Sequence, residues 1–344
     1  MSDVLLVDVG STFTKAALVD TATGRLLATA GHPTTLGTDV LEGLDAVRAQ
    51  AERRAGRHAD DVLACSSAGG GLRIAVVGYE RLVTAEAGHR VALSAGGKVV
   101  HVAAGPLDDP RTPGGPRLDD LRAARPDVVL LVGGTDGGNA DVLLHNARRL
   151  GIARLPVPVV VAGNADVADA AGDELERRRR HVVVAPNVLP RIGVLDPLGA
   201  RAAIREVFLS HVIGGKHLSR GPRFARLVRA ATPDAVLAGV EVLADGAPAD
   251  GVPGAGDVLV VDVGGATTDV YSVLTPDGED ATLAKEVVAT LWRARTVEGD
   301  LGMRWGAPGV VTAAVAERLL DAPDAARLAT HADRAHAEPG WVPS

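Results

Sequence analysis

Hydrophobic and polar positions alternate in short runs along the first part of the chain, a pattern typical of β-strands. Apolar runs at residues 4–9, 16–19 and 26–30 are separated by turns rich in Gly, Ser, Thr and Asp, which predicts an antiparallel meander. Residues 38–54 carry apolar side chains at a helical spacing and predict the first helix. Residues 62–65 predict a further strand.

From residue 72 onward, apolar runs alternate with helical patterns. The runs occupy residues 72–77, 99–103, 128–132, 157–162 and 182–185, and the helical patterns between them include 139–150 and 166–180. Buried β-branched runs that alternate with helices predict a mostly parallel sheet covered by helices. Residues 106–126 contain five prolines and predict a loop or hinge.

Helical patterns continue in the second half of the chain. They cover residues 199–213, 223–230, 233–243 and 308–320, with a Gly- and Pro-rich break at 245–257, strands at 258–261 and 270–273, and a polar stretch from 321 to 344. The whole pattern predicts an α/β protein.

Composition narrows the class of protein. The 344 residues favour two domains, and 47% hydrophobic with 23% charged residues is a globular composition. A net charge of −7 and only 2% aromatic residues argue against nucleic-acid, anionic-membrane or base-stacking surfaces. The single cysteine, Cys65, excludes an intrachain disulfide and fits a reducing cytosol. We therefore expect a cytoplasmic protein with no nucleic-acid or membrane partner.

One sequence unit occurs twice. LLVDVGSTFTK at residues 5–15 matches LVVDVGGATTD at residues 259–269, and the aspartates Asp8 and Asp262 lie 254 positions apart. Each unit is an apolar strand, then Asp-Val-Gly, then a Gly/Ser/Thr turn and a second strand. This spacing is too long for a tandem repeat and predicts the first hairpins of two duplicated domains.

These residue types suit a phosphate site. Glycine lets backbone N–H groups approach an anion closely, and Ser or Thr hydroxyls add donors. A carboxylate at the end of a strand is a hard oxygen ligand suited to Mg²⁺, so Asp8 and Asp262 can hold a metal between two hairpins. Lys15 follows the first turn and adds a positive charge for a phosphate. The paired units therefore predict a nucleotide phosphate site.

The paired motifs resemble the phosphate 1 and phosphate 2 motifs of the acetate and sugar kinase, Hsp70 and actin superfamily of ATPases. Longer segments narrow the resemblance: LACSSAGGG at 63–71, LLVGGTDGGN at 130–139, VVAGN at 160–164, residues 232–246, VDVGGATTDVYSV at 261–273 and RTVEGDLGMR at 295–304. From about residue 4 to about residue 320, the chain is similar to the methylaspartate (glutamate) mutase accessory protein family, also called MutL or GlmL, which is unrelated to the mismatch-repair protein of similar name.

The resemblance implies an actin-like ATPase fold of two ribonuclease-H-like domains that close on ATP and Mg²⁺. The expected division is residues 1–71 for the first part of domain I, 72–190 for an inserted α/β subdomain, 191–256 for a helical segment that completes domain I, and 257–344 for domain II. Family members continue beyond the equivalent of residue 320 to a glycine-rich turn that holds adenosine. The second domain is therefore expected to be truncated here.

The resemblance also implies a role and a set of site residues. The role is that of an ATP-dependent reactivating chaperone for an adenosylcobalamin-dependent mutase. Asp8 and Asp262 would be the catalytic and metal-binding residues. The phosphate-binding residues would be Gly10, Ser11, Thr12 and Lys15 in the first hairpin and Gly264, Gly265, Thr267 and Thr268 in the second.

Two further groups are weaker candidates. Gly134, Thr135 and Asp136 lie between a strand and a helix, where an anion or a partner can bind, or where the turn is simply capped. Glu298 and Asp300 can orient water or contact a metal, or equally cap the following helix.

Alternatives to the chaperone remain open at the level of sequence. They are a small-molecule kinase of the same superfamily and a non-hydrolysing scaffold for the mutase. If the chain is an enzyme, it is expected to be an ATP phosphohydrolase and not the mutase.

Overall fold

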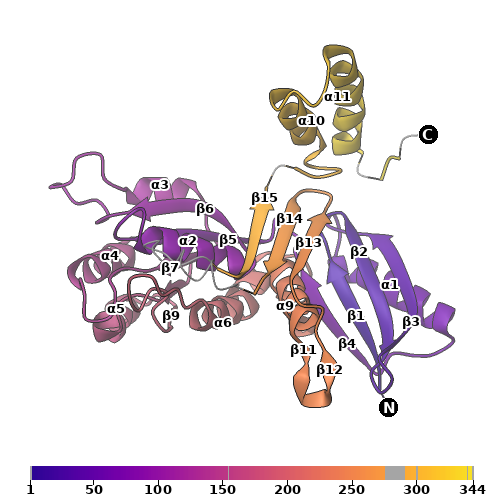
Figure 1. Ribbon diagram of the computed structural model, residues 1–344, viewed down its shortest axis with the longest axis horizontal. Coiled ribbons are helices and arrows are strands. Elements are labelled where there is room, and N and C mark those ends of the chain that lie inside the picture. Colours follow the sequence, from indigo (N-terminus) through magenta and orange to yellow (C-terminus); the bar gives the residue numbers. More distant parts are fainter. Residues whose placement is uncertain (1, 154, 276–290, 300, 339, 343–344) are drawn as a thin grey trace.

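The protein is described from a computed structural model, in which residues 2–153, 155–275, 291–299, 301–338 and 340–342 are placed. Strands and helices alternate along the chain and several strands run parallel, so the expected α/β fold is confirmed at that level. Figure 1 shows an α/β insert on one side, a first sheet on the other and a smaller sheet between them.

The first sheet combines four strands near the N-terminus with one strand from much later in the chain. Its strands are β1 (Asp3–Val9), β2 (Phe13–Asp20), β3 (Arg25–Pro33), β4 (Asp61–Ser66) and β10 (Val228–Ala231), in the order β10-β4-β1-β2-β3. β1, β2 and β3 are antiparallel neighbours, as the alternating pattern predicts, whereas β4 and β10 run parallel to β1. Helix α1 (Val40–Ala55) packs on one face of this sheet through Val40, Leu44, Val47 and Ala51.

Strand β10 corrects the helix expected at residues 223–230. Helix α8 (Arg223–Leu227) ends before β10, and residues 228–231 pair in parallel with β4 instead. A short apolar run does not distinguish a helix from a buried strand, and the free edge of β4 decides the outcome here. The chain therefore returns to the first sheet after more than 150 residues spent elsewhere.

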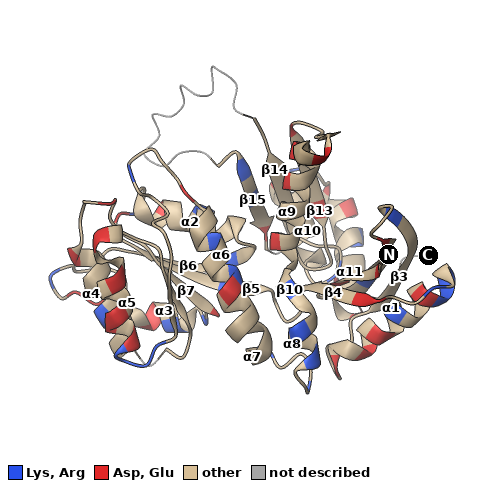
Figure 2. Ribbon diagram, turned by 90° about the horizontal axis from the view of Figure 1, so that it is seen from below, with Lys and Arg blue, Asp and Glu red and all other residues tan. Residues whose placement is uncertain are grey.

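The insert is a parallel sheet between layers of helices. Strands β5 (Leu72–Gly78), β6 (Gly97–Ala104), β7 (Val128–Leu131), β8 (Val159–Val161) and β9 (Val182–Val184) lie in the order β6-β5-β7-β8-β9. Helices α2 (Thr84–Ser94), α3 (Leu118–Ala123), α4 (Asp141–Ile152), α5 (Ala165–Glu176) and α6 (Leu198–Val207) accompany them. The segment 106–126, which was expected to be a loop, thus contains the short helix α3. Helices α4 and α5 carry many charged residues, as Figure 2 shows.

Helix α9 (Thr232–Asp245) links the first sheet to the smaller sheet. Earlier in the chain, α6 continues into a π-helical turn (Phe208–Val212) and α7 (Ile213–Gly215). After α9, the chain forms β11 (Gly246–Ala247), a 3₁₀ turn (Pro248–Asp250) and β12 (Val252–Pro253). The smaller sheet consists of β13 (Val258–Val263), β14 (Thr268–Val273) and β15 (Arg293–Glu298), all antiparallel. Leu237 and Val240 of α9 pack against Tyr271 and Val273 of β14.

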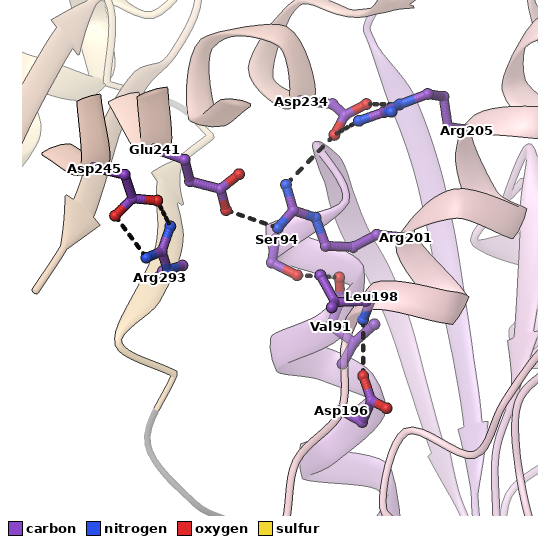
Figure 3. Close-up of polar contacts among 10 residues, drawn as sticks. All are labelled: Val91, Ser94, Asp196, Leu198, Arg201, Arg205, Asp234, Glu241, Asp245 and Arg293. Atoms are coloured by element: carbon purple, nitrogen blue, oxygen red, sulfur yellow. Dashed lines mark hydrogen bonds and ion pairs between the residues drawn. The ribbon is translucent and has the colours of Figure 1, made fainter. Parts of the chain in front are cut away.

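A partly buried ionic cluster holds α9 against helix α6 of the insert. Asp234, in the first turn of α9, accepts hydrogen bonds from Arg205 of α6 at 2.6 and 2.9 Å, and Arg201 donates to Glu241 at 2.9 Å (Figure 3). Asp234 and Arg201 are both buried. At the other end of α9, Arg293 of β15 forms a two-pronged ion pair with Asp245. Helix α9 is therefore tied to the insert and to the smaller sheet.

Elements that the polarity pattern did not predict include β15 and α11 (Ala322–Ala337), the latter within the polar stretch 321–344. Helix α10 (Ala307–Ala316) precedes α11, and both stand apart from the smaller sheet in Figure 1. Among the placed residues, no helix combines the length and the apolar character needed to cross a bilayer.

Candidate functional site

The repeated sequence units form equivalent hairpins. In the first, β1 pairs with β2 so that Asp8 lies opposite Lys15; in the second, β13 pairs with β14 so that Asp262 lies opposite Asp269. Asp262 lies 254 positions after Asp8, and Asp269 lies 254 positions after Lys15. The repeat seen in the sequence is therefore also a repeat of backbone register.

The turns of the two hairpins are closed by the same hydrogen bond. The amide of Gly10 donates to the carbonyl of Phe13 at 3.1 Å, and the amide of Gly264 donates to the carbonyl of Thr267 at 2.8 Å. These donors and acceptors are again equivalent in the two units. The Gly/Ser/Thr turns thus have matching local structures, as expected when the same sequence pattern closes both hairpins.

Both hairpins line one cleft of about 280 Å³. The predicted site residues that line it are Asp8, Gly10, Ser11, Thr12 and Lys15 from the first unit and Asp262, Gly264, Gly265 and Thr267 from the second. The fold therefore brings together two segments that are about 250 residues apart. Their roles in binding stay predictions.

The two turns approach each other closely at Gly265. A Cβ atom built on Gly265 would lie 2.5 Å from Oγ1 of Thr12, in the opposite hairpin. Real Cβ contacts are not that short, so a side chain at this position requires Thr12 or the turn to move. Glycine at position 265 therefore sets the width of the cleft.

Asp8 lies in a polar network at one wall of the cleft. Its Oδ1 accepts a hydrogen bond from Oγ1 of Thr232 at 2.7 Å and a weaker one from Sγ of Cys65 at 3.7 Å, while Nζ of Lys15 lies 3.6 Å from Oδ2. Burial, together with the nearby Asp8 carboxylate, raises the pKa of the Cys65 thiol to about 12. Cys65 is therefore a neutral hydrogen-bond donor to Asp8 and not a nucleophile.

Asp262 lies at the opposite wall in an environment that disfavours its charge. Partial burial raises its pKa, and the carboxylates of Asp269 and Asp8 act in the same direction, against the lowering effect of Lys15. A carboxylate crowded by other carboxylates gains stability when a cation enters the site. Asp8 and Asp262 therefore suit a bound cation.

The second carboxylate of this hairpin, Asp269, has a dedicated partner. Arg295 on β15 contacts Oδ1 of Asp269 through Nε at 2.7 Å and through its terminal nitrogen at 2.5 Å, and both side chains are buried. Arg295 also donates to the carbonyl of Gly97 in the insert at 2.9 Å. Where the first hairpin has Lys15, the second thus has an aspartate that a buried arginine neutralises.

Several lining residues were not predicted from the sequence. They are Thr232, Lys98, Arg295 and Asp269, together with Ser67, Gly70 and Gly71 of the quoted segment 63–71. The sequence held only weak indications of their role. Lys98 is one of four lysines in the chain, and Arg295 lies in the quoted segment 295–304. No local pattern indicates that a side chain from the insert reaches the cleft.

Other predicted residues lie outside the cleft. Thr268 points to the other face of β14, where its hydroxyl donates to the carbonyl of Leu301 at 2.8 Å. Glu298 is the exposed last residue of β15, and Asp300 lies outside the described residues.

The insert loop with Gly134, Thr135 and Asp136 does not line this cleft either. Its carboxylate has structural partners: Asp136 accepts hydrogen bonds from the amide of Ala165, at the start of α5, and from the side chain of Asn187. The geometry supports the turn-capping interpretation of this loop.

The donor set limits which metal fits. Within the placed residues, no group of three or more His, Cys, Asp and Glu side chains can hold a metal ion. Two carboxylates fit Mg²⁺, which keeps several waters and usually completes its shell with substrate phosphates. A metal held by protein side chains alone does not fit this cleft.

Comparisons with known proteins agree with one another. A family model described as MutL protein matches residues 4–344. Protein MutL of Clostridium tetanomorphum is 37% identical over 310 residues, which cover 89% of this chain and 65% of that protein. The chain thus spans about two thirds of the length of the curated relative.

Proposed function

The chain belongs to the MutL protein family, and from that premise we propose that it is an ATP-binding accessory protein of an adenosylcobalamin-dependent mutase of the glutamate mutase type. In this proposal, the chain binds ATP and Mg²⁺ between its two Asp-x-Gly hairpins. Binding and hydrolysis would drive the reactivation of a mutase whose cofactor has been damaged. We infer the partner and the cofactor from the family, and the matching geometry of the two hairpins supports the proposed nucleotide site.

One observation carries the nucleotide site: two hairpins with the same sequence, register and turn hydrogen bond face each other across a single cleft. Backbone N–H groups of both turns, with the hydroxyls of Ser11, Thr12 and Thr267, are the donors that a chain of phosphates needs. Lys15 and Lys98 supply positive charge at the same cleft. A single hairpin offers only half of this arrangement.

The topology supports an actin-like ATPase fold. The first sheet has three antiparallel strands followed by two parallel ones, and the hairpin that opens it recurs at the start of the smaller sheet. We propose that the first sheet belongs to one ribonuclease-H-like domain and the smaller sheet to a second. The proposed division at residues 71, 190 and 256 places the cleft between the two domains and beside the insert.

In this site, Asp8 and Asp262 would hold Mg²⁺, and Thr232 would keep the Asp8 carboxylate oriented through its 2.7 Å hydrogen bond. Bound Mg²⁺ would supply charge stabilisation for the phosphates. Arg295 would neutralise Asp269 so that the second hairpin does not repel them. These residues position and stabilise groups, which is the main contribution that phosphoryl-transfer proteins make.

Nucleotide binding by the purified protein tests this site. Titration calorimetry with ATP and Mg²⁺ should show Asp8→Ala and Asp262→Ala weakening the affinity by about tenfold or more, a loss of about 1.4 kcal/mol each. Asp250→Ala is the matched control, because Asp250 is exposed and lies outside the cleft. Equal affinity in all four proteins would refute the site.

The accessory role needs a second measurement. Phosphate release is measured with and without the mutase and should rise when inactivated mutase is added. Transfer of phosphate from ATP to a small metabolite would support a kinase instead. Binding of the mutase without any turnover would support a scaffold.

A further inference from the structure

The two duplicated hairpins differ in one charge beside the turn. In the first hairpin, Lys15 lies opposite Asp8, and its Nζ is 3.6 Å from Oδ2 of that carboxylate. The equivalent residue of the second hairpin, 254 positions later, is Asp269, which lies opposite Asp262. The second hairpin therefore carries a negative charge where the first carries a positive one.

Arg295 offsets the charge of Asp269 but supplies none for a ligand. It is only 5% exposed, and its Nε donates to Oδ1 of Asp269 at 2.7 Å. It also donates to the carbonyls of Gly97 at 2.9 Å and Leu93 at 3.4 Å, both in the insert. A paired arginine and aspartate have no net charge, so together they attract an anion only weakly. The second hairpin still needs a cation if it is to hold a phosphate as the first does.

The insert places a lysine beside the second hairpin. Lys98 is the second residue of β6, and its exposed side chain lines the cleft. Its Nζ lies 3.4 Å from the carbonyl oxygen of Gly299. Gly299 directly follows Glu298, which pairs with Thr268 just beyond the second turn. The ammonium group of Lys98 therefore lies next to the end of β14 that leads out of this turn.

The contact that Lys98 makes in the structure is one that a phosphate can replace. A distance of 3.4 Å exceeds the usual range for a nitrogen–oxygen hydrogen bond, about 2.7–3.2 Å. The carbonyl of Gly299 is neutral, whereas a phosphate oxygen carries negative charge and binds an ammonium group more strongly. Glycine at position 299 also leaves space for the ammonium group, since a Cβ atom there would lie 2.5 Å from Nζ.

The backbone of Lys98 is held firmly by the two glycines before it. Gly96 has a φ of +80°, and a Cβ atom on it would lie 2.8 Å from the amide nitrogen of Asp234 in α9. A Cβ atom on Gly97 would clash with Cδ1 of Ile74 in β5. Glycine permits these close approaches, so the start of β6 is packed tightly against α9 and β5. The long side chain of Lys98 is thus attached at a fixed point of the insert.

From this comparison we propose that Lys98 is the phosphate-binding lysine of the second hairpin, supplied by the insert. Its ammonium group leaves the carbonyl of Gly299 and binds a phosphate of the nucleotide held at the second turn. The site is then complete only while the start of β6 stands beside β15. Phosphate binding and this position of the insert therefore favour each other to the same extent. The inference rests on the proposed function, because it requires a phosphate ligand in the cleft.

Titration calorimetry with Mg²⁺ and either ATP or tripolyphosphate tests the role of Lys98. Lys98→Met and Lys98→Gln should each weaken the affinity for both ligands by about tenfold, because the charge-assisted hydrogen bond to phosphate is lost. Lys98→Arg keeps the positive charge and should recover most of the affinity. Arg81→Met is the matched control and should bind both ligands normally, since Arg81 is an exposed cation of the insert outside the cleft.

Hydrogen exchange measures the link between the phosphate and the insert. In the unmodified protein, saturating ATP and Mg²⁺ should slow amide exchange at the start of β6 as well as in the two hairpin turns. In Lys98→Met, at a nucleotide concentration that again saturates the site, the turns should keep this protection and the start of β6 should lose it.

The outcomes separate this inference from the proposed nucleotide site. If the unmodified protein binds neither ATP nor tripolyphosphate, both fail. If Asp8→Ala and Asp262→Ala weaken binding but the Lys98 variants do not, the nucleotide site stands and the role of Lys98 is refuted. A loss with ATP but not with tripolyphosphate, or an equal loss in Arg81→Met, also overturns that role. Equal protection of β6 in the unmodified protein and in Lys98→Met would overturn the link to the insert.

Discussion

Two arginines on the same strand offer a direct comparison of a buried and an exposed ion pair. Arg295 and Asp269 are both buried, whereas Arg293, two residues earlier on β15, pairs with Asp245 while both side chains are about half exposed. Both pairs are short and involve two nitrogen–oxygen contacts. We therefore expect Arg295→Met to be far more destabilising than Arg293→Met.

The magnitudes follow from burial. Removing one partner of a buried pair leaves an uncompensated charge and costs about 3–5 kcal/mol. Arg295→Met also removes the hydrogen bond to the carbonyl of Gly97. An exposed pair contributes only about 0.2–1 kcal/mol, so Arg293→Met should have little effect.

Urea unfolding followed by far-ultraviolet circular dichroism measures the difference. With a slope of about 3 kcal/mol per molar urea, the Arg295→Met midpoint should fall by about 1 M or more, and the Arg293→Met midpoint by about 0.3 M or less. Adding Asp269→Asn to Arg295→Met should recover part of the lost urea midpoint, because it removes the carboxylate charge that Arg295→Met leaves unpaired. Equal losses for the two arginine variants, or no recovery in the double variant, would refute the reasoning from burial.

The remaining predictions concern the cleft. Gly265→Ala should weaken ATP binding severalfold, because the new methyl group displaces Thr12, whereas Gly37→Ala, which meets no atom within 4 Å, should bind ATP normally in the same titration. Because the folded-state pKa of Asp262 is raised, its ionisation costs stability at neutral pH. Asp262→Asn should therefore raise the urea midpoint at pH 7, and this gain should disappear as the pH falls below the ordinary aspartate range. The pKa of Cys65 is about 12 in the folded protein against an ordinary 9.0, so its thiolate fraction should be about 1000-fold smaller than in the unfolded chain. Iodoacetamide at pH 8 should therefore label Cys65 rapidly only after unfolding.

The sequence determined the local elements and the nature of the candidate site. Apolar alternation located β1 to β3, and helical spacing located α1, because these patterns depend on neighbouring positions in the chain. Asp-Val-Gly occurs twice with the same flanks, which located both hairpins, while phosphate binding by their turns stays a prediction. The conformation of a short turn is set mainly by its own residues, so it can be predicted without the rest of the fold.

Only the tertiary structure decided which distant residues complete the site. Thr232 reaches Asp8 because β10 pairs with β4, and residues 228–231 form this strand only because that edge is free. Arg295 reaches Asp269 because β15 pairs with β14, across residues whose polarity pattern predicted no strand. Burial of the two duplicated apolar strands likewise depends on which helix packs on them, so identical sequence patterns end as core in β1 and as surface in β13. Contacts between segments far apart in the chain leave little trace in local periodicity, since their energy arises only when the complete fold brings them together.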